Sequence, residues 1–130
     1  MPLEPDIRFR AKASDANVPM EIKVAESWSL AQLEDALSIQ LIGRYMRDRH
    51  NRWGILLLVH QKVRPRGWLT AGGNWLTFDQ VVTHLRSLAR SIAAAEPNAP
   101  QAEIAVIDVS TVLTVKTKKL RQKAVSKGNP

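Results

Sequence analysis

Apolar and polar residues alternate along two short stretches near the start of the chain. In residues 6–12 and again in residues 18–25 an apolar side chain follows almost every polar one, a period of two that is typical of a β-strand. The turn cluster Ser14-Asp15-Ala16-Asn17 separates the two stretches. Because this connection is short, we expect the strands to pair as an antiparallel hairpin.

The hydrophobic period changes to that of a helix at Ser29. Ser29 and Gln32 form a capping box, which predicts a helix that runs to about Met46. A second capping box, Thr77 and Gln80, opens another helix with one apolar face. The first helix carries four leucines at helical spacing: Leu30, Leu33, Leu37 and Leu41.

Two further segments are typical of strands. Residues 54–60 are almost continuously apolar, which predicts a strand buried on both faces in the middle of a sheet that helices cover. Residues 103–109 are expected to form the last strand, and residues 62–75, rich in glycine, arginine and tryptophan, a loop. The order hairpin, helix, strand, helix, strand predicts an α/β domain with a mixed sheet.

Composition narrows the class of protein. The chain has 130 residues, enough for one domain with a single core, and its 45% hydrophobic content is ordinary. It contains no cysteine, which excludes disulfides and cysteine zinc sites. It has no apolar run of membrane-spanning length and no signal-peptide pattern, so we expect a cytoplasmic protein.

The formal net charge of +7 is concentrated at the C-terminal end. Residues 111–130 hold 6 Lys or Arg and no Asp or Glu, whereas residues 1–110 hold 13 basic and 12 acidic residues. We therefore expect a folded domain over residues 1–110 and a flexible basic tail over residues 111–130. Such tails contact nucleic acid in some proteins and only increase solubility in others.

The second expected strand contains two charged side chains among apolar ones, a carboxylate and an ammonium. Glu21 and Lys23 are two residues apart, so their side chains share one face, while Met20, Ile22 and Val24 share the other. A charge on a half-buried strand costs free energy unless it is paired, solvated or bound to a metal. A divalent-metal site with an attendant lysine fits this arrangement.

Pro5-Asp6, followed about fifteen residues later by Glu21-Ile22-Lys23, resembles the signature of the PD-(D/E)XK nuclease superfamily. In that family the first acidic residue opens one strand, Glu-X-Lys lies on the adjacent antiparallel strand, and a helix and another strand follow. Gln40 and Tyr45 are similar to the Gln-and-Tyr motif of its RecB-type branch. The resemblance implies a restriction-endonuclease-like sheet, from which we expect the usual N-terminal helix and first strand to be missing.

The resemblance also implies a deoxyribonuclease that depends on Mg²⁺ or Mn²⁺. Asp6, Glu21 and the backbone carbonyl of Ile22 would bind the metal, which lowers the pKa of its bound water and clamps the phosphate. Lys23 would orient or deprotonate the attacking water, and Gln40 would hold a metal-bound water or a phosphate. The expected phosphate contacts to DNA come from basic side chains: Arg44, Arg47, Arg49, Arg52, Lys62, Arg64 and Arg66.

Other interpretations of the same residues stay open. Glu21 and Lys23 would also suit an exposed charge pair on a solvated sheet face. We expect the nuclease domain to be part of a larger repair or defence protein. The alternatives are a nucleic-acid-binding module that keeps the nuclease fold but does not cut, and an assembly domain that forms a homodimer through a bare sheet edge. A second apolar helix surface would serve such a dimer: Ile39, Ile42 and Met46. The tryptophans between residues 53 and 75 would either stack on bases or pack within the loop.

Overall fold

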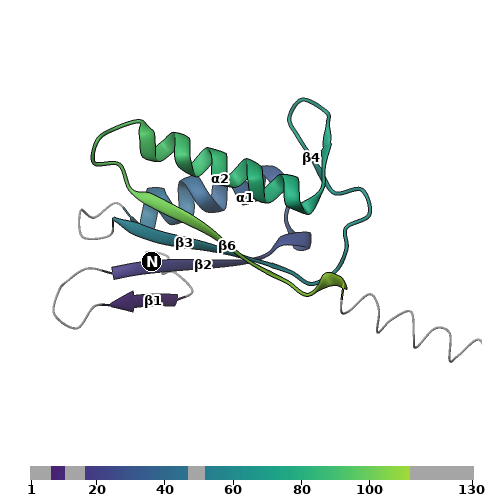
Figure 1. Cartoon of the computed structure of the whole chain (residues 1–130), viewed down its shortest axis with the longest axis horizontal. Helices are drawn as coiled ribbons and strands as arrows, with labels where there is room; N and C mark the ends of the chain where they lie inside the picture. The colour runs from purple at the N-terminus through teal and green to yellow at the C-terminus, as the bar shows by residue number, and fades with distance from the viewer. Residues whose placement is uncertain (1–6, 11–16, 47–51, 112–130) are drawn as a thin grey trace, which may run out of the picture.

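A four-stranded mixed sheet forms the centre of the protein (Figure 1). The computed structural model describes residues 7–10, 17–46 and 52–111. The strand order is β1-β2-β3-β6, in which β1 is antiparallel to β2 and the other three strands are parallel. The strands are β1 (Ile7–Arg10), β2 (Asn17–Val24), β3 (Trp53–His60) and β6 (Gln101–Asp108). The expected hairpin and mixed α/β class are confirmed.

The helices cover one face of this sheet (Figure 1). Both capping boxes are present, and they open α1 (Leu30–Asp35) and α2 (Phe78–Ala94). The first helix continues beyond α1 as a π-helix, η2 (Ala36–Tyr45). In a π-helix each backbone N–H donates to the carbonyl five residues earlier, instead of four. A short 3₁₀ turn, η1 (Ala25–Ser27), joins β2 to this helix.

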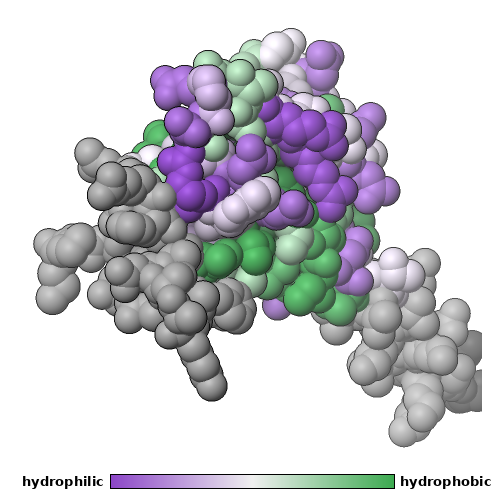
Figure 2. Space-filling model, turned by 60° about the vertical axis from the view of Figure 1, so that its left-hand side comes forward, coloured by the Kyte–Doolittle hydropathy of each residue, from purple (hydrophilic) through white to green (hydrophobic). Residues whose placement is uncertain are grey.

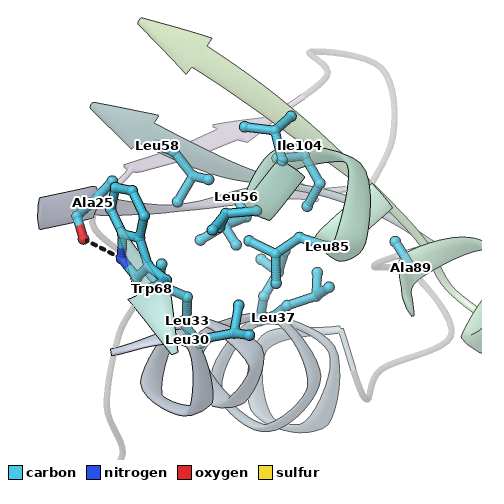
Figure 3. Packing of buried hydrophobic residues seen from close by; sticks show 14 of the residues in the cluster. Ala25, Leu30, Leu33, Leu37, Leu56, Leu58, Trp68, Leu85, Ala89 and Ile104 are labelled. Carbon is cyan, nitrogen blue, oxygen red and sulfur yellow. Dashed lines mark hydrogen bonds between the residues drawn. The ribbon is translucent and has the colours of Figure 1, made fainter. Parts of the chain in front are cut away.

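The core lies between the covered face of the sheet and the helices (Figure 3). Leucines from β3 meet the leucine stripe of α1 and η2, as the helical spacing predicts, and the apolar face of α2 closes the layer. Met46 is also buried and Ile42 packs against the core, so the expected second apolar surface of the first helix reduces to Ile39. The central side chains are Leu33, Leu37, Leu41, Leu56, Leu58, Trp68, Val81 and Leu85.

The expectation that β3 is buried on both faces is wrong. Its burial alternates, with Leu56 and Leu58 buried and Ile55, Leu57 and Val59 only half-buried, because the described helices lie on one face alone. In Figure 2 hydrophobic side chains gather at the level of the sheet, below the hydrophilic surface of the helices. No helix in the described part of the chain is long and apolar enough to cross a membrane.

The segment expected to be a loop contains a small hairpin of its own. Strands β4 (Trp68–Leu69) and β5 (Trp75–Leu76) pair antiparallel, separately from the main sheet. The hairpin follows β3 and leads into α2 (Figure 1). Two-residue strands are too short to show a period of two, which explains why sequence patterning did not find them.

Candidate functional site

Glu21 and Lys23 lie on the covered face of the sheet. In the parallel ladder Glu21 is opposite Leu56 and Lys23 is opposite Leu58, and both leucines belong to the core. Opposite residues of a ladder point to the same face, so the two charged side chains point toward the helix layer. The strand parity predicted from the sequence is thereby confirmed.

The two charges form a buried ion pair. Lys23 Nζ lies 3.1 Å from Glu21 Oε1, and the side chains are 15% and 7% exposed, respectively. The ammonium also lies 4.6 Å from the centroid of the Trp28 ring, within range of a cation–π interaction. The interpretation of Glu21 and Lys23 as an exposed pair on a solvated face is therefore wrong.

Asp6, the other predicted metal ligand, lies outside the described residues. The β1–β2 ladder reaches the residue that follows it, since Ile7 is opposite Met20. Among the residues the structure describes, no three His, Asp or Glu side chains gather closely enough to hold a metal ion. The described part of the predicted metal site thus consists of Glu21 and the backbone of Ile22.

The predicted helix residues occupy different environments. Gln40 is half-buried on η2, and no hydrogen bond between its amide and either Glu21 or Lys23 is found in the described structure. Arg44 is exposed in the last turn of η2. Tyr45 is buried among the core residues, where a packing role suits it.

The predicted DNA-contacting residues fall at two opposite ends of the sheet. Arg52 directly precedes β3, and its carbonyl accepts a hydrogen bond from Gln101 N–H at 2.8 Å. Lys62, Arg64 and Arg66 follow the other end of β3, on the side where Lys23 lies near the end of β2. Eight extended residues separate the two ends by about 25 Å. Arg47 and Arg49 lie outside the described residues.

Trp28 connects Lys23 to the segment after β3. Its carbonyl accepts hydrogen bonds from Arg64 Nη1 at 2.7 Å and from Trp68 Nε1 at 3.0 Å. The Arg64 guanidinium also lies 5.2 Å from the Trp68 ring centroid. Through these contacts the turn after β2 holds Arg64 and Trp68 at the same end of the sheet as Lys23.

Glu26 fixes the start of that segment. Its carboxylate accepts hydrogen bonds from the backbone N–H groups of Gln61, at 3.1 Å, and Lys62, at 2.9 Å. Neither Glu26 nor Trp28 was found by sequence reasoning. Both act on partners more than thirty residues away, and no local pattern signals such contacts.

A second polar group lies at the end of β6. Ser110 donates hydrogen bonds to Asp108 Oδ1 from its hydroxyl, at 2.7 Å, and from its backbone N–H, at 3.0 Å. These bonds, with a smaller contribution from His60, hold the pKa of Asp108 below its ordinary value. His60 is buried, with Nδ1 3.3 Å from Asp108 Oδ1, and its ring stacks on Phe78 at a centroid distance of 4.1 Å.

Comparison of the chain with family models, with curated proteins and with solved structures finds no significant match. The class that fold and site define is a mixed α/β domain with a buried acid–lysine pair on its second strand.

Proposed function

We propose that the chain is a metal-dependent nuclease domain with a restriction-endonuclease-like arrangement, and that it hydrolyses phosphodiester bonds of DNA. The observation that carries the proposal is the ion pair between Glu21 and Lys23 on the covered face of the sheet. Apolar side chains of similar volume would stabilise such a position equally well or better. A charged pair at this position therefore favours a chemical role.

The register of the first two strands supports a second carboxylate beside this pair. Ile7 is opposite Met20; in the sequence Asp6 directly precedes Ile7, and Glu21 directly follows Met20. The proposal requires the ladder to continue for one more pair in the same register. Opposite residues of an antiparallel pair have Cβ atoms about 5 Å apart, which suits two ligands of one cation.

Asp6, Glu21 and the backbone carbonyl of Ile22 would hold Mg²⁺ or Mn²⁺. Hard divalent cations bind oxygen, usually from one or two carboxylates together with waters and substrate phosphate, and the Glu21 carboxylate fits this donor set. When bound, such an ion neutralises charge on the phosphate and makes its bound water more acidic.

Lys23 would orient or deprotonate the attacking water and offset negative charge that develops on the phosphate oxygens. Its ammonium is held between the Glu21 carboxylate, at 3.1 Å, and the Trp28 ring, at 4.6 Å, which limits the positions the amine can take. Gln40 would hold a water or a phosphate from the helix side. Arg64, fixed by the Trp28 carbonyl, would neutralise a neighbouring phosphate.

Nicking of supercoiled plasmid in the presence of Mg²⁺ or Mn²⁺ tests this proposal. We expect the full chain to nick the plasmid, and EDTA to stop the reaction. Lys23→Met and Glu21→Gln should each slow nicking at least about 100-fold, the usual contribution of a positioned proton-transfer group or charge in the transition state.

Two controls separate chemistry from folding. Each single substitution leaves a buried charge unpaired, which costs about 3–5 kcal/mol, whereas the double variant Glu21→Gln/Lys23→Met removes both charges and should fold with nearly normal stability. We expect this double variant to be inactive although folded. Arg90→Ala, an exposed change on α2, should nick at the normal rate. Normal nicking by the double variant would show that the pair is only structural.

A further inference from the structure

The β4–β5 hairpin is anchored to the core by one of its faces. Trp68 is buried, and its Nε1 donates a hydrogen bond to the carbonyl of Ala25 at 3.3 Å (Figure 3). The same nitrogen donates to the carbonyl of Trp28 at 3.0 Å. Leu76, opposite Trp68 in the ladder, packs against the same core. Because these two side chains hold the hairpin down, its other face keeps a fixed position on the protein.

That other face presents an aromatic ring to solvent. Leu69 and Trp75 are opposite each other in the ladder and are 49% and 48% exposed. The guanidinium of Arg66 lies 5.9 Å from the centroid of the Trp75 ring. An exposed indole beside a guanidinium is suited to binding a flat aromatic group next to a negative charge.

The charge of the segment favours a polyanion. Residues 61–78 contain Lys62, Arg64 and Arg66 and no Asp or Glu. Lys62 and Arg66 are exposed, whereas Arg64 is half-buried against Trp28 and Trp68. The exposed cations thus lie on the chain that leads from β3 to the exposed tryptophan.

We propose that the β4–β5 hairpin binds single-stranded DNA, with an unpaired base stacked on Trp75 and phosphates held by Lys62 and Arg66. The identification of the polymer as DNA rests on the proposed nuclease function. In a duplex both faces of each base are already stacked, so an exposed indole finds a free base face only on an unpaired strand. The hairpin follows the end of β3 nearest Lys23 and is anchored to the turn after β2, so it lies at the same end of the sheet as Lys23.

Fluorescence anisotropy of a labelled twelve-nucleotide oligothymidine, measured in EDTA, tests the inference on the full chain. We expect tighter binding of this strand than of a duplex of equal length. Trp75→Ala should weaken single-strand binding at least about fivefold, the lower range for loss of one base–aromatic stack. Trp75→Phe should restore most of the affinity, because a phenyl ring also stacks.

Two matched controls accompany these variants. Trp53→Ala removes a tryptophan that is 56% exposed at the opposite end of β3, and it should bind normally. Leu69→Ala removes the cross-strand neighbour of Trp75 without removing a ring, and its affinity should change less than twofold. Equal affinity for both DNA forms, or normal binding by Trp75→Ala, would overturn the inference.

The binding test is independent of cleavage. EDTA prevents metal-dependent cutting, so a chain that never nicks plasmid can still show binding that depends on Trp75. That result would contradict the nuclease proposal and leave the hairpin as a single-strand-binding site. Conversely, normal nicking together with single-strand binding that is unchanged by Trp75→Ala would overturn only the proposed role of the hairpin.

Discussion

The side chain and the backbone of Trp28 have different roles. Its indole ring lies against the Lys23 ammonium, and its backbone carbonyl accepts hydrogen bonds from Arg64 and Trp68. One residue thereby fixes both the amine of the buried ion pair and the base of the hairpin. The two proposed sites therefore share a contact residue in the turn after β2.

Asp108 provides a prediction about acid stability. The hydrogen bonds from Ser110 lower its pKa in the folded protein below the ordinary value of about 3.9. A group whose pKa falls on folding stabilises the protein above its unfolded pKa, and this contribution is lost as the pH falls through its folded pKa. We therefore expect Asp108→Asn to reduce the free energy of unfolding above about pH 5 and to have little effect in strong acid.

The effect should be small, below about 1 kcal/mol, because the side chain is 41% exposed and solvent screens its charge. Urea unfolding at a series of pH values, from about pH 7 through the ordinary Asp pKa of about 3.9 into stronger acid, measures the difference. Ser110→Ala, which removes the hydroxyl donor, should show a weaker version of the same pH dependence. A difference that does not change with pH would contradict the assignment.

The backbone of the β4–β5 hairpin depends on Gly67. Its φ of +76° lies in the left-handed region, and a Cβ atom there would meet the backbone carbonyl of Leu76. We expect Gly67→Ala to destabilise the protein by about 2–4 kcal/mol, since a backbone clash adds to the dihedral strain.

Gly72→Ala is the matched control for this substitution. A Cβ at Gly72 would meet only the Thr70 hydroxyl, at 3.9 Å, so the cost should stay below about 0.5 kcal/mol. Thermal unfolding of both variants compares them directly. Equal stability of the two would show that the backbone around Gly67 relaxes without difficulty.

Elements with strong local signals could be predicted from the sequence, and those fixed by distant contacts could not. The capping boxes at Ser29 and Thr77 are local, and both helices begin where they indicate. The β4–β5 hairpin depends instead on Trp68, whose hydrogen-bond acceptors are 40 and 43 residues away. The change of the first helix from α-helix to π-helix at η2 could not be predicted, because the spacing of its apolar residues is that of an ordinary α-helix.

The candidate site was predictable from the sequence only where it depends on which side chains of one strand share a face. Glu21 and Lys23 share a face because two residues separate them, and the sequence shows this directly. The sequence could not show that Glu21 and Lys23 point to the helix-covered face of the sheet, because their register with the leucines of β3 decides which face they share. The same continuous apolar run suits a strand covered on either or both faces, which is why the burial of β3 was predicted wrongly.

The distribution of charge over the whole chain leads to a last prediction. Residues 1–110 have a formal charge of +1, so long-range attraction to DNA has to come mainly from the six cations of residues 111–130. Each phosphate contact to a single strand contributes about 0.7 to the slope of log affinity against log salt concentration. Removing residues 112–130 should therefore weaken oligothymidine binding and flatten its salt dependence, whereas Trp75→Ala should weaken binding with little change in slope. Binding titrations from about 50 to 200 mM salt separate the two effects. A slope unchanged by the deletion would mean that the tail makes no phosphate contacts, and the affinity would then have to come from Lys62, Arg66 and their neighbours.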